Sequence, residues 1–335
     1  LFSGIGGFSL GFQRAGYQFT EHYFSEIDKH AIANYKNNFP NAKYIGDITS
    51  LHGGDFTGID IITFGSPCQD FSMAGKRAGL AGAKSSLIEY AIALIADIRP
   101  SIFIWENVKG AFSSNAGADF WAILQAFANI GGYRLEWQLL NTSWILPQNR
   151  ERIYLIGHLA GRSECGVFPI REDDFAFTKK SGRLGGLHSD MTVIQVGTYR
   201  THNDGKGFRE VKSKVSPTIP ARARQDGSGM PVIQINPSKE SGGKQPYQQN
   251  RVFDEKGISP ALTRHNSDYA ISRMRRLTEI ECERLQGFPE NWTQYGNYNG
   301  TIKPIAKTQR YKLIGNAVTV DIVTMIAKRL KFIEQ

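Results

Sequence analysis

Short apolar runs alternate with helical patterns over the first 160 residues of the chain. Four of these runs predict buried strands, at residues 59–64, 101–105, 137–141 and 152–159. Residues 86–98 and 119–130 each repeat apolar side chains at helical spacing, and the second pattern ends at two glycines. Strands that alternate with helices predict an α/β fold, with a mixed, mainly parallel sheet covered on both faces.

The pattern changes after about residue 160. Residues 161–272 are rich in Gly, Ser, Pro, Asn and basic residues, which predicts a smaller, loop-rich β region. Two similar segments, 193–222 and 232–264, favour a duplicated β unit in it, with chance similarity as the alternative. Helical signals return with a capping box at 278–281 and an amphipathic pattern at 319–332. We therefore expect a core of residues 1–160, the β region at 161–272, and a return to the core at 273–335, whose final helix packs beside the first strand.

The formal net charge of +9 is unevenly placed. Residues 1–170 hold 13 Lys and Arg against 14 Asp and Glu, residues 171–273 hold 17 against 11, and residues 274–335 hold 10 against 6. The excess of positive charge therefore lies in the second half of the chain. A basic face suits a polyanion such as nucleic acid, although an ordinary basic surface explains the charge equally well.

The positions of the cysteines and histidines bear on whether the protein has disulfides or a metal site. The three cysteines are far apart in sequence, and the seven histidines show no ligand spacing. This usage predicts no disulfide framework, no metal site and a reducing compartment, the cytoplasm. We find no apolar run of about 18 residues, so no membrane contact is expected.

One cysteine stands where a buried strand should end. The segment GSPCQDFS at 65–72 follows the apolar run at 59–64, so Cys68 comes just after the end of this run. A core cysteine would lie inside the run. Glu106 directly follows the run at 101–105. Open α/β sheets bind ligands outside the carboxyl ends of their strands, so we expect both residues at that edge.

The segment LFSGIGGF at 1–8 predicts a glycine-rich turn between a strand and a helix, where the backbone can approach a ligand. A dinucleotide fingerprint needs a glycine at position 9, where Ser9 stands, and this disfavours a nicotinamide dehydrogenase. Glu26 is placed to hold ribose hydroxyls, or simply to begin a helix, and Asp47 is placed to meet an adenine edge. The turn fits a nucleoside ligand without specifying which one.

Several motifs together make the sequence resemble the DNA cytosine-5 methyltransferases. They are LFSGIGGF at 1–8, GSPCQDFS at 65–72, ENV at 106–108, QNRER at 148–152, RRLTEIECERLQGFP at 275–289 and GNAV at 315–318, in the family's order. The resemblance implies a Rossmann-like methyltransferase core, S-adenosyl-L-methionine as cofactor with S-adenosyl-L-homocysteine as product, and cytosine in double-stranded DNA as substrate. The sequence departs from the family pattern at Gly82, Lys84 and Ser85, and it starts inside the first motif.

The chemistry of this reaction can be assigned to four side chains. Cytosine C5 becomes nucleophilic only after a nucleophile adds at C6, and a thiolate such as that of Cys68 suits this step. Glu106 suits an acid at N3, and Arg152, like its analogue in the family, suits a guanidinium at O2. We expect Arg150 to support the catalytic loop or to contact a phosphate. The target base must be flipped out of the duplex to reach these groups.

The resemblance also implies binding residues. The cofactor would be held by Phe2, Gly4, Gly6, Gly7, Glu26, Ile27, Asp47, Pro67, Asn316 and Val318, with Glu26 on the ribose and Ile27 on the adenine. A basic, glycine-rich loop would close over DNA through Gln69, Ser72, Lys76, Arg77 and Lys84. In the target-recognition region, candidates for contacts with phosphates or guanine edges are Arg200, Arg222, Arg224, Arg251 and Arg264.

Two further functions fit parts of the sequence. A tRNA cytosine-5 methyltransferase of the same fold is disfavoured by the large basic insert. A non-catalytic DNA-binding relative is disfavoured because Cys68, Glu106 and Arg152 are all present. We expect a monomeric bacterial enzyme bound to double-stranded DNA, with a restriction endonuclease that acts on the same site as a candidate partner. The recognised DNA sequence is not predicted.

Overall fold

The computed structural model describes residues 1–67, 86–175 and 275–333, together with four short strands between residues 195 and 234. The elements of the first half are α1 (Gly7–Arg14), β1 (Tyr23–Phe24), α2 (Lys29–Asn38), β2 (Lys43–Tyr44), β3 (Ile61–Phe64), α3 (Ser86–Ile98), β4 (Ile102–Val108), α4 (Lys109–Ser113), α5 (Ala118–Asn129), β5 (Tyr133–Asn141), β6 (Gln148–Asn149), β7 (Glu151–Leu159) and β8 (Ser163–Glu164). Those of the second half are β9 (Gln195–Tyr199), β10 (Phe208–Glu210), β11 (Ser216–Pro217), β12 (Pro231–Gln234), β13 (Arg275–Arg276), α7 (Glu279–Leu285), β14 (Tyr295–Tyr298), β15 (Thr301–Pro304), α8 (Lys307–Asn316), α9 (Val320–Arg329) and β16 (Lys331–Phe332).

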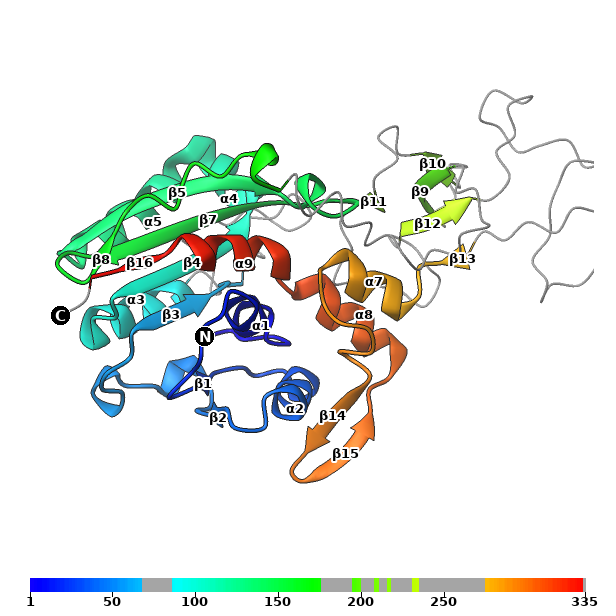
Figure 1. Cartoon of the computed structure of the whole chain (residues 1–335), viewed down its shortest axis with the longest axis horizontal. Coiled ribbons are helices and arrows are strands. Elements are labelled where there is room, and N and C mark those ends of the chain that lie inside the picture. Colours follow the sequence, from blue (N-terminus) through cyan, green and yellow to red (C-terminus); the bar gives the residue numbers. More distant parts are fainter. Residues whose placement is uncertain are drawn as a thin grey trace, which may run out of the picture.

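A mixed sheet with the strand order β3-β4-β7-β5 forms the centre of the molecule (Figure 1). Strands β3 and β4 are parallel, because α3 carries the chain back between them, and β7 is antiparallel to both of its neighbours. Residues 142–150 join β5 to β7 without a helix that crosses the sheet, which is why these two strands run in opposite directions. A second parallel pair, β1 and β2, lies beside the first residues of the chain, where the Ser3 amide donates to the Ser25 carbonyl. The prediction of a mixed sheet within an α/β fold is confirmed.

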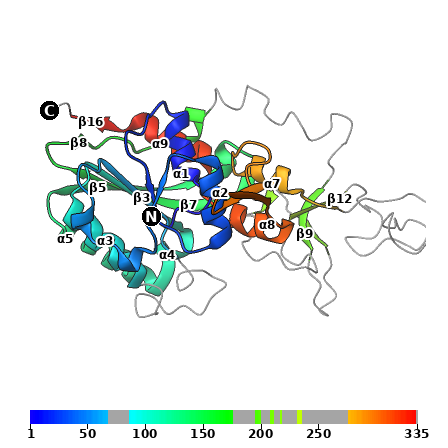
Figure 2. The ribbon, with the colours of Figure 1, turned by 90° about the horizontal axis from the view of Figure 1, so that it is seen from below.

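Helices cover both faces of this sheet. Figure 2 shows α3, α4 and α5 on one face and α1 and α9 on the other. Side chains alternate along β4, so Phe103 and Trp105 pack in the cluster with α3 and α5, whereas Ile102 and Ile104 pack in the cluster with α9. All four are fully buried. The two faces of the sheet therefore have separate cores. Because side chains alternate along β4, the position of a residue in this strand decides which helix layer its side chain faces.

Helices α1 and α9, from opposite ends of the chain, pack closely. A Cβ at Gly11 would lie 2.5 Å from Val323 Cγ1, so only glycine allows this approach. The Tyr17 hydroxyl donates to the Ala327 carbonyl at 3.0 Å, and Arg14 forms an ion pair with Asp321 at 3.2 Å. The final helix expected over 319–332 ends at Arg329, and residues 331–332 instead pair with β8. The last helix thus secures α1, which directly follows the glycine-rich turn.

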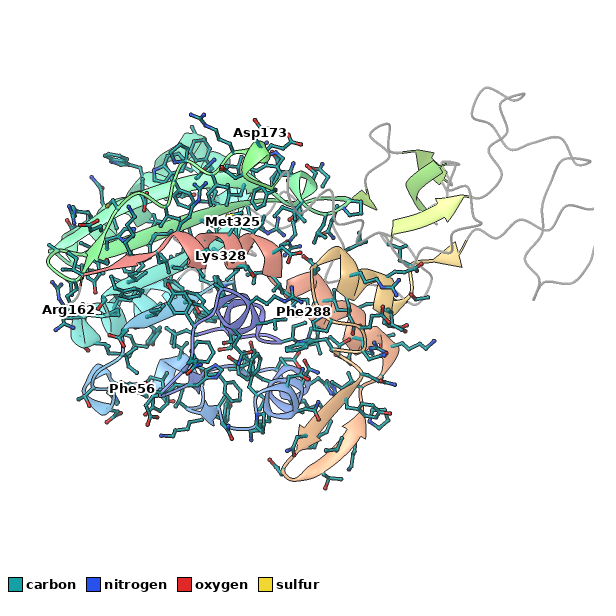
Figure 3. All side chains as sticks on the ribbon, in the orientation of Figure 1. Phe56, Arg162, Asp173, Phe288, Met325 and Lys328 are labelled. Atoms are coloured by element: carbon teal, nitrogen blue, oxygen red, sulfur yellow. The ribbon has the colours of Figure 1, made fainter. Side chains whose placement is uncertain are left out.

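A third core joins α2 to α7 and α8. Its entry is the expected capping box, because the Glu281 amide donates to Thr278 Oγ1 and the Glu281 carboxylate accepts from the Thr278 amide at 2.8 Å. Inside the core, the fully buried Glu283 accepts from the Thr293 amide at 2.8 Å and from Arg310 at 3.0 Å. Phe288, near the middle of Figure 3, lies at the contact of this core with α1.

The four short strands between residues 195 and 234, β9 to β12, pair with one another and with strands from other parts of the chain. Strands β10, β9, β12 and β13 form an antiparallel sheet, in which Val196 lies opposite Ile233. These residues belong to the two segments that resemble each other in sequence, so the similar strands pair with one another. Strand β11 pairs in parallel with β6, directly before Arg150. No helix within the described ranges is long and apolar enough to cross a membrane.

Candidate active site

Glu106 and Arg152 form an ion pair at one end of the central sheet. The expected strand at 101–105 continues to Val108, so Glu106 lies within β4, not after it, and faces the same side as Ile104. Arg152 is the second residue of β7 and lies diagonally across from Glu106, since Glu106 is opposite Tyr154 and Val108 is opposite Arg152. Arg152 Nε lies 3.1 Å from Glu106 Oε1, and only 14% and 11% of the two side chains are exposed. The sheet therefore presents an acid and a guanidinium together in a mostly dry position.

The segment Gly65–Pro67, which leads into Cys68, is fastened beside this pair. Strand β3 ends at Phe64, and a Cβ on the next residue, Gly65, would lie 2.9 Å from Glu106 Oε2. Ser66 Oγ accepts hydrogen bonds from Trp105 Nε1 at 3.0 Å and from Asn107 Nδ2 at 3.3 Å. Both donors are buried residues of β4 on either side of Glu106. The chain before Cys68 is thus held against the carboxylate, although Cys68 itself lies outside the described residues.

Tyr154 is a member of this site that the sequence analysis missed. Its side chain is fully buried opposite Glu106, and its hydroxyl has no hydrogen-bond partner in the part of the chain that the structure describes. Burial, followed by the charge of Glu106, raises the pKa of Tyr154, so the hydroxyl keeps its proton. The alternation along β7 places Tyr154 on the same face as Arg152, and this signal could have identified it.

Arg150 is placed differently from the expected phosphate contact, whereas the expected support of the catalytic loop stays a prediction, because that loop lies outside the described residues. Its guanidinium is buried, with 3% of the residue exposed, and donates to the Gly315 carbonyl at 3.3 Å and the Ala317 carbonyl at 2.7 Å. A phosphate on the surface cannot reach a group in this position. Arg150 therefore fastens the segment that carries Asn316 and Val318 to the strand that carries Arg152.

The glycine-rich turn is organised around Glu26. Glu26 Oε2 accepts from the Gly4 amide at 2.8 Å, while Oε1 accepts from the Ile27 and Asp28 amides at 2.8 and 3.0 Å. These bonds use three of about four acceptor positions of a carboxylate, which leaves one for a hydroxyl group. Phe2 adopts a positive φ of 50°, which is uncommon for a residue with a side chain and is typical of functional turns.

Gly6 and Gly7 allow close packing beneath the turn. A Cβ at Gly6 would lie 2.3 Å from the Phe39 ring, and one at Gly7 would lie 2.7 Å from Val318 Cγ2. Helix α1 begins at Gly7 without a side-chain cap, so its first amides are available for an anionic group. Gly4, by contrast, has open space on its Cα, where a ligand can approach the backbone.

The other predicted cofactor residues differ in their exposure. Ile27 is 73% exposed, Pro67 is half-buried, Asn316 is exposed, and Val318 is buried at 8%. Asp47 is exposed and caps a short helical turn by accepting from the Thr49 amide at 3.1 Å. An exposed apolar side chain, a fixed carboxylate and free helix amides fit the adenine, ribose and carboxylate parts of an adenosyl amino acid.

The predicted DNA-contacting residues lie outside the described residues. They are Gln69, Ser72, Lys76, Arg77 and Lys84 of the predicted loop, and Arg200, Arg222, Arg224, Arg251 and Arg264 of the predicted recognition region. Their roles stay predictions. The structure brings Glu106, Arg152 and Gly65 together in one place, and Glu26 and the glycine-rich turn together in another.

The arrangement of sheet and helices is that of an α/β methyltransferase. The fold is similar to the crystal structure of Dnmt2 methyltransferase from S. pombe, with a TM-score of 0.62, 19% identity and coverage of 97% of this chain and 94% of that one. It is also similar to the Entamoeba histolytica methyltransferase EhMeth, with a TM-score of 0.55, 16% identity and coverage of 97% and 94%. At these identities the similarity establishes the fold.

Sequence comparison establishes the family. Residues 1–332 match the model of the C-5 cytosine-specific DNA methylases, and the chain belongs to this family. It is 29% identical to the Type II methyltransferase M.Bsp6I of Bacillus sp. (strain RFL6) over 98% of this chain and 96% of that protein. It is 31% identical to the Type II methyltransferase M1.ScrFI of Lactococcus lactis subsp. cremoris over 98% and 76%. The expected family and enzyme class, a DNA cytosine-5 methyltransferase, are therefore confirmed.

Proposed function

We propose that the enzyme transfers a methyl group from S-adenosylmethionine to C5 of a flipped-out cytosine in a specific sequence of duplex DNA. The observation that carries this proposal is the Glu106–Arg152 ion pair beside Gly65–Pro67, the segment that leads into Cys68. An acid, a guanidinium and a thiol are the three groups that activation of a cytosine ring requires.

The reaction begins when the Cys68 thiolate adds to C6 of the cytosine ring. Electron density moves toward N3 and O2, where Glu106, once its carboxyl group holds a proton, donates that proton to N3, and Arg152 donates a hydrogen bond to O2. When bound, S-adenosylmethionine supplies the electrophilic methyl group that C5 attacks. A base, for which water is the candidate, then takes the C5 proton, the C5–C6 double bond re-forms and the Cys68 sulfur is expelled. N3 returns its proton to Glu106, so the enzyme groups regain their starting state.

The burial of the Glu106–Arg152 pair supports this division of labour. Because each side chain is less than one-sixth exposed, water screens their charges only weakly. Both groups are held by adjacent strands before a base arrives, so little reorganisation is required during the reaction. The hydrogen-bonded Ser66 fixes the approach of the chain to the same point.

The cofactor is proposed to lie along the glycine-rich turn. Glu26 would accept from a ribose hydroxyl at its remaining acceptor position, Ile27 would pack on the adenine, and Asp47 would accept from the adenine amine. Phe2, Gly4, Gly6 and Gly7 would follow the amino-acid part, with Pro67, Asn316 and Val318 completing the wall. Arg150 would act through its bonds to Gly315 and Ala317, as a positioning residue for that wall.

Double-stranded DNA is the proposed macromolecular substrate, and the family supports DNA as the acceptor. The basic residues between 171 and 273 are proposed to contact phosphates and guanine edges. A monomeric state and a partner endonuclease that acts on the same sequence stay predictions. The curated relatives described above are Type II methyltransferases, which is consistent with such a partner.

The decisive experiment is bisulfite sequencing of a plasmid from cells that express the chain, beside cells that express a Cys68→Ser variant. We expect protected cytosines at one recurring sequence with the parent and none with the variant. Duplex DNA containing 5-fluorocytosine should trap a covalent adduct with the parent, because fluorine cannot leave as the C5 proton does. Methylation of tRNA instead of DNA would favour the RNA enzyme, and DNA binding without an adduct would favour the non-catalytic relative.

A further inference from the structure

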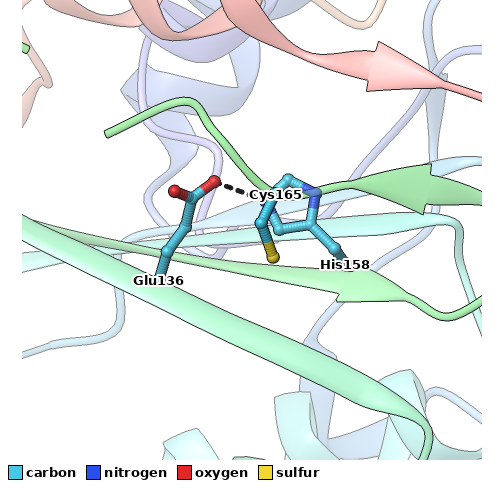
Figure 4. Close-up of side chains that lie close together, drawn as sticks. All are labelled: Glu136, His158 and Cys165. Atoms are coloured by element: carbon cyan, nitrogen blue, oxygen red, sulfur yellow. Dashed lines mark hydrogen bonds and ion pairs between the residues drawn. The ribbon is translucent and has the colours of Figure 1, made fainter. Parts of the chain in front are cut away.

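A second cluster of reactive side chains lies at the opposite end of the central sheet. Glu136 belongs to β5, His158 belongs to β7, and Cys165 follows β8 in the connection beyond it (Figure 4). A carboxylate oxygen, an imidazole nitrogen and the Cys165 sulfur lie within 4.8 Å of one another. His158 is six residues beyond Arg152 along β7, which corresponds to about 20 Å of extended strand. The cluster is therefore separate from the proposed catalytic groups.

The orientation of the His158 ring is fixed by a partner on its far side. Ser163 Oγ donates its single proton to the Ser101 carbonyl at 3.0 Å. Its 3.2 Å contact with His158 Nδ1 therefore requires an N–H on that nitrogen. This leaves Nε2 directed at Glu136 Oε1, 2.8 Å away. A histidine that binds a metal through Nε2 is usually held by a hydrogen bond from Nδ1 in this way.

The Glu136 carboxylate is also held in place, by hydrogen bonds from backbone amides. The amides of Gly166, Val167 and Phe168 donate to its two oxygens at 3.1 to 3.3 Å. Those bonds hold the connection that contains Cys165 over the end of β5. Cys165 is exposed, so the open side of the cluster faces solvent and a cation can enter. The cluster thus has two ligands held in place by further hydrogen bonds and a third, Cys165, on its exposed side.

We propose that Glu136, His158 and Cys165 bind a zinc ion. One sulfur, one nitrogen and one oxygen form a ligand set that zinc accepts, with a fourth, tetrahedral position open to water. Zinc bonds of about 2.0–2.3 Å set neighbouring ligand atoms about 3.3–3.7 Å apart. Nε2 and Oε1 must therefore separate by about half an ångström, while Cys165 moves inward. Binding releases the thiol proton of Cys165 and the proton between His158 and Glu136.

No sequence pattern indicated this site, because its ligands come from two strands and a connection, without a short motif spacing. Its place in the fold indicates a structural role. The ion would join the connection after β8 to the ends of β5 and β7 that lie away from Glu106. We therefore expect zinc to raise the melting temperature and to leave the chemical step unchanged.

The test uses the full chain with Cys68→Ser, so that the exposed Cys165 and the fully buried Cys282 are the two thiols that remain. Titration with zinc against a chromophoric chelator should show one equivalent bound. Adding Cys165→Ser should abolish this binding, and adding Ser163→Ala instead should weaken it by roughly 10- to 100-fold. Cobalt should give thiolate-to-metal absorption only when Cys165 is present. Circular dichroism of each variant verifies that it is folded.

Three results would overturn the proposal. They are no zinc uptake by the Cys68→Ser chain, equal zinc affinity with and without Cys165, and a cobalt complex that lacks thiolate absorption. Any of these would leave Glu136 and His158 as an ordinary hydrogen-bonded ion pair that fastens the sheet to the connection after it.

Discussion

Replacement of Gly65 by alanine tests whether the position of the Glu106 carboxylate controls the reaction. The new Cβ would lie 2.9 Å from Glu106 Oε2, whereas ordinary contacts of a Cβ begin at 3.4 Å. The carboxylate must therefore move by about 0.5 Å or more, away from its place beside Arg152. The backbone at Gly65 has no positive φ, so the substitution perturbs the site through this contact and not through backbone strain.

The size of the effect follows from this displacement. A misplacement of about 1 Å can cost a factor of about 100 in rate, so half that distance should cost roughly tenfold, or about 1.4 kcal/mol in the barrier. The free energy of unfolding should fall by only about 1 kcal/mol, because the contact falls on the far end of the Glu106 side chain and not on backbone. DNA affinity should be unchanged, since the perturbed groups act on the flipped base.

Single-turnover methylation of duplex DNA with labelled S-adenosylmethionine measures the chemical step. Gly54→Ala is the matched control, because a Cβ there has nothing within 4 Å and the φ is not positive. The control should react at the parental rate. A Gly65→Ala enzyme that is folded, binds DNA normally and also reacts at the parental rate would refute the argument that Glu106 must stay in this position.

Three further substitutions probe the rest of the structure. Arg310→Ala leaves the buried Glu283 without its cation and should lower the free energy of unfolding in urea by about 3–5 kcal/mol, whereas loss of the exposed Arg284–Glu290 pair through Arg284→Ala should cost at most about 1 kcal/mol. Burial lowers the pKa of His22 to about 4, so below about pH 6.5 the unfolded chain binds a proton that the folded chain does not. The free energy of unfolding should therefore fall as the pH decreases from 6.5 toward 4. His22→Gln should make this fall smaller in urea titrations at pH 7 and 5. Ser66→Ala removes the shared acceptor of two buried donors and should slow single-turnover methylation while DNA affinity is kept, and an unchanged rate would contradict the positioning role of Ser66.

Much of the central sheet could be predicted from local patterns. The apolar runs identified β3, β4, β5 and β7 to within a few residues, and α3 was predicted with its observed bounds. These elements are long and strongly periodic, so side-chain burial alone reveals them. The reversed direction of β7 was not visible, because strand direction depends on whether the connection crosses the sheet.

The site was predictable where a side chain's role depends on its neighbours in sequence. Glu106 was expected beside the ligand edge, and its pairing with Arg152 follows from two neighbouring strands. The phosphate contact offered for Arg150 was wrong, because its described partners at Gly315 and Ala317 come from a distant part of the chain. The roles of Gly65 and Ser66 could not be predicted from composition. Gly65 acts by having no side chain beside Glu106, and Ser66 acts by accepting hydrogen bonds from two buried donors.

The packing of α1 against α9 has a consequence for synthesis. The Tyr17 hydroxyl finds its acceptor at Ala327, 310 residues later in the chain, so α1 leaves the ribosome long before its partner exists. Until then, the apolar side of α1 and one face of β4 and β7 have no cover, and a nascent chain in this state is exposed to chaperones and proteases. The glycine-rich turn gains its support last, and a host cell meets this enzyme in working form only after translation is nearly complete.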